Sequence, residues 1–202
     1  MNNFWNERYR RKEYIYGTNP NHFLVEQLKD IPAGRVLIPC DGEGRNSVFA
    51  AKIGWKTEAF DLSVEGMKKA HQLASHNNVT ISYRLADVLT AEYPPDRFNV
   101  IALMYAHFSP ETRISLHNKV VTWLKPGGVV VVEAFNPLQI NNTSGGPKDA
   151  SMLYSEEMLN NDFSNLQTQI SRTETIVLDE GEYHQGKADV VRYVGIKTNN
   201  VA

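Results

Sequence analysis

The chain of 202 residues has a single cysteine, Cys40, and lacks any long apolar run. One cysteine excludes an internal disulfide framework. The longest apolar run, residues 100–106, is far shorter than a bilayer-spanning helix. Residues 1–30 carry charges throughout and contain no apolar stretch of signal-peptide length. We therefore expect a cytoplasmic protein without a membrane partner.

The chain also lacks an excess of charge of one sign, since its formal net charge is −2. So small a charge offers no field that would attract nucleic acid. The six histidines show neither an HExxH motif nor a Cys/His ligand spacing, so no metal site is predicted. Composition and length are those of a globular protein, and we expect a single domain over residues 1–202.

No repeat or linker interrupts the sequence, and apolar runs of strand length alternate with helix-length segments between residues 35 and 135. Such alternation is typical of βαβ units that form a parallel sheet. Helices are expected to begin near Glu43, at Ser63 and at Pro110. The expected strands are residues 35–39, 56–61, 81–86, 98–106 and 128–135.

The third of these helices has the clearest start signal. Ser109 is expected to cap its first turn through the hydroxyl, and Pro110 suits the first helical position. Ile114, Val121 and Leu124 recur at helical spacing and predict a core-facing stripe.

The texture of the sequence changes after residue 135. Residues 136–152 are polar and rich in Gly, Pro and Asn, which predicts a functional loop insert. Residues 155–163 are expected to be helical. Two strand-like runs, residues 166–178 and 188–198, predict an antiparallel pair added to the parallel sheet.

The leading segment, residues 1–30, mixes aromatic and basic side chains and predicts a helical lid over an apolar pocket. Trp5 and Tyr16 are its candidate substrate contacts. A turn that contains Gly17 supplies a hinge. Phe108, far along the chain, is a candidate for another apolar wall.

The stretch VLIPCDGEGRNSVFA, residues 36–50, places Gly42 and Gly44 directly after the first strand. Three interpretations compete for this turn: a phosphate loop, a dinucleotide turn and an S-adenosylmethionine (SAM) turn. A phosphate loop would require Gly-Lys-Ser/Thr after the glycines, but the sequence continues Arg-Asn-Ser. A dinucleotide turn would require a third glycine where Ser47 stands.

Two acids follow the next two strands. Asp61 ends the second strand, where a carboxylate can accept both hydroxyl hydrogens of a ribose. Asp87 follows the third strand at the same sheet edge and could accept from an adenine amino group. This second acid favours adenosine recognition over a pyrophosphate.

The successive segments VLIPCDGEGRNS, AFDLS, RLADV, FNVIALMYAHF and LKPGGVVVVEAF resemble the motifs of class I SAM-dependent methyltransferases, in order. The resemblance spans about residues 14–197. It is strongest with the small tellurite-resistance and thiopurine-type branch, through GEGRNS, the leading segment and the late GEYH.

The resemblance implies a Rossmann-like α/β fold with a seven-stranded, mostly parallel sheet, one antiparallel strand and helices on both faces. It implies SAM as cofactor, S-adenosylhomocysteine as product and a small-molecule acceptor such as a thiol or a chalcogen oxyanion like tellurite. The glycines would bind the methionine part, Asp61 the ribose and Asp87 the adenine. The implied cofactor-binding residues are Cys40, Asp41, Gly42, Gly44, Asn46, Asp61, Leu62, Ala86, Asp87, Val88, Met104 and Tyr105.

Two positions depart from the family pattern. Ile38 stands where an acid is usual, and Cys40 stands where the first glycine is usual. Cys40 fits there without strain if its backbone angle is ordinary. Asp41 or Glu43 is the candidate replacement for the missing acid.

Methyl transfer from a sulfonium mainly requires alignment and exclusion of water, so a general base is optional. The candidate catalytic residues are His184, His107 and Tyr105. Arg192 points either into the site, to bind an anionic substrate, or into solvent.

Two alternatives remain open from the sequence. One is a SAM-binding module that has lost catalysis, which the departures at Ile38 and Cys40 keep in view. The other is an NAD-dependent oxidoreductase, although no Tyr-x-x-x-Lys pair is present. The sequence does not determine the methyl acceptor or the oligomeric state.

Overall fold

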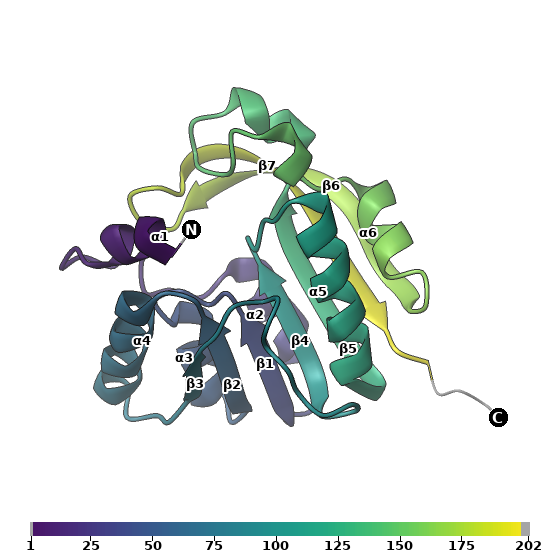
Figure 1. Cartoon of the computed structure of the whole chain (residues 1–202), viewed down its shortest axis with the longest axis horizontal. Coiled ribbons are helices and arrows are strands. Elements are labelled where there is room, and N and C mark those ends of the chain that lie inside the picture. The colour runs from purple at the N-terminus through teal and green to yellow at the C-terminus, as the bar shows by residue number, and fades with distance from the viewer. Residues whose placement is uncertain (1, 199–202) are drawn as a thin grey trace.

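The computed structural model describes residues 2–198, which fold into one seven-stranded sheet with helices packed against it (Figure 1). The strand order is β3-β2-β1-β4-β5-β7-β6. Strand β7 runs antiparallel to both of its neighbours, and the other pairings are parallel. This confirms the expected sheet with one antiparallel strand. The strands are β1 (Arg35–Pro39), β2 (Lys56–Asp61), β3 (Ser82–Leu85), β4 (Phe98–Met104), β5 (Leu124–Phe135), β6 (Gln167–Asp179) and β7 (Gln185–Ile196).

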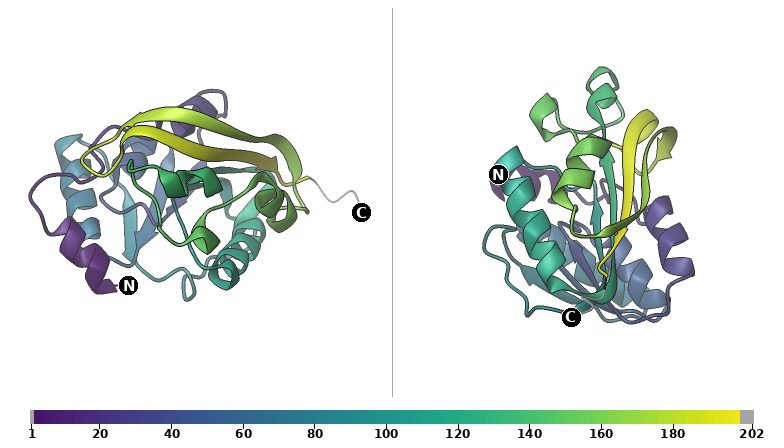
Figure 2. Two further views of the ribbon diagram at one scale, coloured as in Figure 1. Left: turned by 90° about the horizontal axis from the view of Figure 1, so that it is seen from above. Right: turned by 90° about the vertical axis from the view of Figure 1, so that its right-hand side faces the viewer.

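Helices cover both faces of the sheet (Figure 2). Buried residues of α2, α3 and α4 form one apolar cluster with the sheet, and those of α5 and α6 form another. The helices are α1 (Asn2–Tyr9), α2 (His22–Lys29), α3 (Arg45–Lys52), α4 (Val64–His76), α5 (Pro110–Trp123) and α6 (Glu156–Asp162), with short 3₁₀ helices η1 (Pro137–Asn141) and η2 (Ala150–Met152). Within residues 2–198, no helix is both long and apolar enough to cross a bilayer.

Successive residues of β1 serve the two clusters in turn. Val36 and Ile38 are buried against α2–α4, while Leu37 is buried against α5 and α6. Because side chains alternate across a strand, a strand buried on both faces reads as a continuous apolar run. The carboxyl ends of the central strands are therefore the places where polar residues can gather.

The core-facing side of α5 differs from the expected stripe. Ile114 is 45% exposed, whereas Leu116 and Val120 are buried. Arg113 is also buried on this helix, and its guanidinium pairs with Asp162 of α6 at 2.7 Å. Paired polar side chains thus take part in the buried side of the helix, which hides the apolar period in the sequence.

Serines precede both α4 and α5, and of these only Ser109, before α5, was predicted to cap its helix. The Ser63 hydroxyl accepts from the Gly66 N–H at 3.1 Å and caps α4. The Ser109 hydroxyl instead contacts the Thr112 hydroxyl at 3.2 Å and makes no backbone cap, so the prediction for α5 was wrong in this detail. Pro110 does occupy the start of that helix.

The glycine turn after β1 holds two helices close to the sheet. Gly44, the N-cap of α3, has φ 88°, and a Cβ built on it would lie 2.5 Å from Cβ of Ala70 in α4. Gly42 has φ 56°, and its Cβ would lie 2.6 Å from the Tyr9 hydroxyl of α1. We expected these glycines to admit a ligand, but their bare sides face α4 and α1. They permit packing of the helices around the turn.

We predict that Gly44→Ala destabilises the protein more than Gly54→Ala. Both glycines have positive φ, 88° and 91°, but no atom lies within 4 Å of the Cβ built on Gly54. The control substitution, Gly54→Ala, should therefore lower the free energy of unfolding only by the left-handed backbone strain, about 1–2 kcal/mol. Gly44→Ala should lower it by about 1–3 kcal/mol more, because the added methyl group is overpacked against Ala70. Urea unfolding of both variants measures the difference. Equal losses would contradict the packing role.

Candidate functional site

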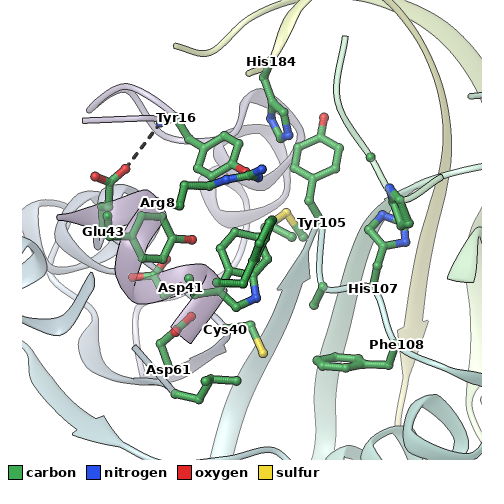
Figure 3. Close-up of a pocket in the computed structure, with 18 of the residues that line it drawn as sticks. Arg8, Tyr16, Cys40, Asp41, Glu43, Asp61, Tyr105, His107, Phe108 and His184 are labelled. Atoms are coloured by element: carbon green, nitrogen blue, oxygen red, sulfur yellow. Dashed lines mark hydrogen bonds between the residues drawn. The ribbon is translucent and has the colours of Figure 1, made fainter. Parts of the chain in front are cut away.

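A cavity of about 530 Å³ opens at the carboxyl edge of the sheet (Figure 3). Cys40, Asp61 and Met104, at the ends of β1, β2 and β4, line it from the sheet side. Helix α1 and the loop of residues 136–152 line it from the opposite side, together with His184 of the β6–β7 turn. Segments far apart in the sequence therefore enclose one volume.

Most of the predicted cofactor-binding residues line this cavity. Asp87 does not: it is exposed, and its Oδ1 accepts from the Leu89 N–H at 2.8 Å. Gly42 and Gly44 are also absent from the lining, for the packing reason given above. The lining residues from the predicted set are Cys40, Asp41, Asn46, Asp61, Leu62, Ala86, Val88, Met104 and Tyr105.

Cys40 has a left-handed backbone, with φ 57°. The condition for a fit without strain, an ordinary backbone angle, is therefore not met, because the chain keeps the conformation for which a glycine is preferred. A non-glycine residue in this region costs of order 1–3 kcal/mol, which the surrounding structure must offset. Burial raises the pKa of the Cys40 thiol well above its usual value, so the thiol stays protonated.

The two acids beside the glycine turn differ in how well they are satisfied. Asp61 accepts from the Gly42 N–H at 3.1 Å and from the Ser63 N–H at 2.8 Å. Asp41 accepts through Oδ2 from the Ser47 N–H at 3.3 Å, but its buried Oδ1 has no partner among the described residues. Burial raises the pKa of Asp61 to about 6 and that of Asp41 to about 7.

Glu43 is fully engaged within the protein. Its Oε1 pairs with Lys69 at 2.7 Å, and its Oε2 accepts from the Ile15 N–H at 2.8 Å. It also accepts from the Tyr16 N–H at 3.4 Å (dashed line in Figure 3). Of the two acids considered as replacements at this turn, only Asp41 retains an unpartnered oxygen.

The hydroxyl of Tyr105, a predicted catalytic residue, is occupied as a hydrogen-bond donor. It follows β4 with φ 53°, and its hydroxyl donates to Glu133 at 2.7 Å. Burial, together with the charge of Glu133, raises the pKa of the phenol well above its usual value. Tyr105 therefore remains a protonated wall residue and not a base.

His107 lines the cavity, but both of its ring nitrogens are engaged. Nδ1 lies 2.7 Å from the Met152 carbonyl oxygen, and Nε2 lies 3.1 Å from the Phe135 N–H. This pattern requires a neutral ring that donates through Nδ1 and accepts through Nε2. Burial lowers the pKa of His107 to about 4. His107 was a candidate catalytic residue with no proton transfer assigned to it. A role as proton acceptor does not fit this geometry, because no lone pair is left; the ring instead joins β5 to the loop of residues 136–152.

Of the two histidines that line the cavity, His184 is the one with a ring nitrogen that makes no hydrogen bond within the described chain. Its Nδ1 lies 3.2 Å from Oε2 of Glu180, and Nε2 has no hydrogen bond among the described residues. Figure 3 shows Tyr16 and Tyr105 beside the ring, at centroid distances of 4.6 and 4.7 Å. Burial lowers the pKa of His184 against the opposing effect of Glu180, so the neutral ring is favoured.

Sequence reasoning missed the carboxylate behind His184. Burial opposes the ionisation of Glu180, but His184 and Arg45 lower its pKa, and Arg45 lies 2.9 Å away. Glu180 precedes the histidine by four residues in EGEYH. That spacing alone has no meaning in a turn, so only the hairpin geometry identifies the pair.

The predicted substrate contacts divide in a similar way. Trp5, Tyr16 and Phe108 line the cavity. Arg192 does not: it is buried on β7, pairs with Glu133 at 2.6 Å and also contacts Glu174. The two open orientations of Arg192 are thus replaced by a third, in which it pairs with the buried Glu133 and the half-buried Glu174.

The geometry of His107 predicts acid-sensitive folding. Its folded-state pKa, about 4, lies below the usual 6.5, so its contribution is complete above about pH 6.5 and is lost as pH falls towards 4. The loss is at most about 3 kcal/mol. Urea unfolding across this pH range measures it, with His107→Gln as the non-titrating variant. An equally steep pH dependence in His107→Gln would contradict the assignment.

Comparison with known proteins agrees with this fold. Residues 36–128 match a family model described as a methyltransferase domain. A phosphoethanolamine N-methyltransferase from Zea mays is 28% identical over 120 residues, which are 59% of this chain and 24% of that protein. The chain therefore spans about a quarter of that relative's length.

Solved structures extend the likeness over nearly the whole chain. TehB from Haemophilus influenzae has a TM-score of 0.72 at 16% identity and covers 98% of this chain and 67% of its own. A SAM-dependent methyltransferase from Methanosarcina mazei has a TM-score of 0.70 at 12% identity, covering 86% and 97%. The sheet order and these solved structures show that the chain has the Rossmann-like fold of class I methyltransferases, and the methyltransferase-domain match covers residues 36–128 of it.

Proposed function

We propose that this protein is a SAM-dependent methyltransferase that acts on a small molecule. The observation that carries the proposal is the buried, unpartnered Oδ1 of Asp41 in the cavity lining. An unsatisfied buried carboxylate oxygen is costly, and an ammonium group would satisfy it. The amino group of the methionine part of SAM has this chemistry, so the residues present fit the cofactor.

The other residues suit the remaining parts of SAM. Asp61 keeps lone pairs beyond its two backbone bonds and is proposed to accept from the ribose hydroxyls. Leu62, Ala86 and Val88 offer an apolar lining for the adenine. Asp41 takes over the role that the usual acid would have at Ile38, which is buried in the apolar core.

Bound SAM supplies an electrophilic methyl group, whose bond to sulfur breaks, with the electron pair staying on sulfur, as the acceptor attacks. The protein aligns the acceptor and excludes water with Tyr16, Tyr105 and Phe108. We propose that Nε2 of His184 receives the proton of a protonated acceptor, while Glu180 holds Nδ1–H. An acceptor that is already anionic needs no such transfer.

The resemblance to the tellurite-resistance and thiopurine-type branch supports a thiol or chalcogen oxyanion as the acceptor. The likeness to a phosphoethanolamine N-methyltransferase supports a small polar amine. Both classes are small enough for the cavity of about 530 Å³ beside a bound cofactor. The alternative of a SAM-binding module without turnover is distinguished by screening these classes for S-adenosylhomocysteine release.

The cofactor assignment is tested by calorimetric titration with SAM, S-adenosylhomocysteine and NAD. We expect binding of the first two only, weakened about 10- to 100-fold in Asp41→Asn because a charge-assisted contact is lost. Asp30→Asn, an exposed acid outside the cavity, is the matched control.

The pKa of about 7 for Asp41 adds a pH signature. Since the ionised carboxylate binds the ammonium, affinity for S-adenosylhomocysteine should rise from about pH 6 to about pH 8 in the wild type and less in Asp41→Asn. NAD binding, or no effect of Asp41→Asn, would overturn the assignment.

The proposed base gives a second test. His184→Gln should lower kcat about 10²- to 10⁴-fold for acceptors that lose a proton, and little for acceptors that are already anionic. Glu180→Gln should shift the pH–rate profile, because it removes the carboxylate that orients the ring. His76→Gln, on the exposed end of α4, is the control. Equal losses for both acceptor types would exclude a base role.

A further inference from the structure

A second cavity, of about 360 Å³, adjoins the first between Arg8 of α1 and the loop of residues 136–152. The two share Arg8, Tyr16, Gly146 and Lys148 in their linings. Among the described residues, those that line the second cavity include two cations and no acid. Its lining consists of Arg8, Tyr16, Thr143, Gly145, Gly146, Lys148 and Tyr183.

Arg8 is a cation held in place without a carboxylate. Its Nη1 donates to the Tyr16 hydroxyl at 2.8 Å. Its guanidinium lies over the rings of Phe4 and Tyr183, at 4.5 and 4.6 Å from their centroids. No ion pair to Arg8 exists within residues 2–198. Ring stacking fixes the guanidinium plane while other N–H groups stay available, which suits bidentate recognition of an anion.

Three other arginines that lie near the cavity or on the sheet are paired with carboxylates. Arg11 pairs with Glu182, Arg45 with Glu180 and Arg192 with Glu133. Arg45 is the other arginine of the cavity lining, and its pairing leaves Arg8 as the available guanidinium there, within the described chain.

Lys148 supplies a second cation from the loop of residues 136–152. It is exposed, its Nζ donates to the Asn142 carbonyl oxygen at 2.8 Å, and no carboxylate pairs with it among the described residues. The acids of the main cavity lie elsewhere, since Asp41 and Glu43 belong to the glycine turn and Asp61 ends β2. We call α1, the rest of the leading segment and the loop of residues 136–152 the roof of the cavity. The acids of the lining thus lie on the sheet side, and the unpaired cations Arg8 and Lys148 lie on the roof.

We infer that the methyl acceptor carries a carboxylate or phosphate group, which Arg8 and Lys148 bind; this rests on the proposed function. Tyr16 connects this anion subsite to the base, since its hydroxyl contacts Arg8 and its ring packs on His184. The loop of residues 136–152, which carries Lys148, also lies close to the base, because a Cβ built on Gly145 would lie 3.3 Å from Nε2 of His184. A compact acceptor therefore spans from the cations to the base. Binding of an anionic substrate, first considered for Arg192, is thus assigned to Arg8.

The test uses matched acceptors that differ in the anionic group. Ethanolamine is compared with phosphoethanolamine, and 2-mercaptoethanol with 3-mercaptopropionate, which separates phosphate from carboxylate. Binding of the anionic members and of inorganic phosphate to protein loaded with S-adenosylhomocysteine is measured by calorimetry, and kcat/KM by release of S-adenosylhomocysteine. Arg8→Met should weaken the anionic members about 10- to 100-fold and leave the members without an anionic group unchanged. Lys148→Met should act in the same direction but more weakly, because its side chain is exposed. Arg10→Met, an exposed arginine outside both linings, is the matched control.

The outcomes separate the two proposals. If the loaded wild-type protein binds no anionic probe, or if Arg8→Met weakens acceptors with and without the anionic group alike, the anion subsite is overturned while SAM binding stands. If SAM and S-adenosylhomocysteine do not bind at all, the proposed function fails first. Unchanged SAM affinity in Arg8→Met shows that a loss for anionic acceptors is not a folding defect.

Discussion

The buried ion pair between Glu43 and Lys69 holds the site together. Both side chains are almost inaccessible, and Glu43 also accepts from the backbone of Ile15 and Tyr16. Lys69 donates in addition to the Glu13 carbonyl oxygen. Removing one partner of such a pair typically costs about 3–5 kcal/mol, because the other charge stays buried. This one contact joins the glycine turn, α4 and the leading segment, and so positions the roof of the cavity.

The roof in turn determines which basic and aromatic side chains face the site. Where the leading segment crosses the β6–β7 turn, a Cβ on Gly181 would lie 2.3 Å from the Ile15 carbonyl oxygen, so the two backbones are in direct contact. This contact brings Tyr16 against His184 and places Arg8 over the second cavity. The proposed cofactor contacts lie on the sheet side and the proposed acceptor contacts on the roof, with His184 between them.

Much of the fold was predictable because its strands and helices follow from the local periodicity of apolar residues. The runs 35–39 and 56–61 match β1 and β2, and the late antiparallel pair is present as β6 and β7. An apolar run between turn signals predicts a buried strand wherever the chain later places it. The prediction was wrong where burial depended on partners: Ile114 is exposed, whereas Arg113, paired with Asp162, lies on the buried side of α5. Helical spacing cannot reveal such a pair.

By itself, the sequence determined the parallel α/β arrangement, the glycine turn after the first strand and the acid at the end of the second. These features depend on residues close together in the chain. Only the tertiary structure decided which functional groups are available for chemistry. Arg192 is occupied by Glu133, 59 residues away, whereas Arg8 is not paired with any carboxylate of the described chain. His107 is saturated by two distant backbone groups, whereas His184 keeps Nε2 unbonded within the same part of the chain. The physical reason is that pairing and desolvation are set by neighbours in space, which the order of residues does not disclose.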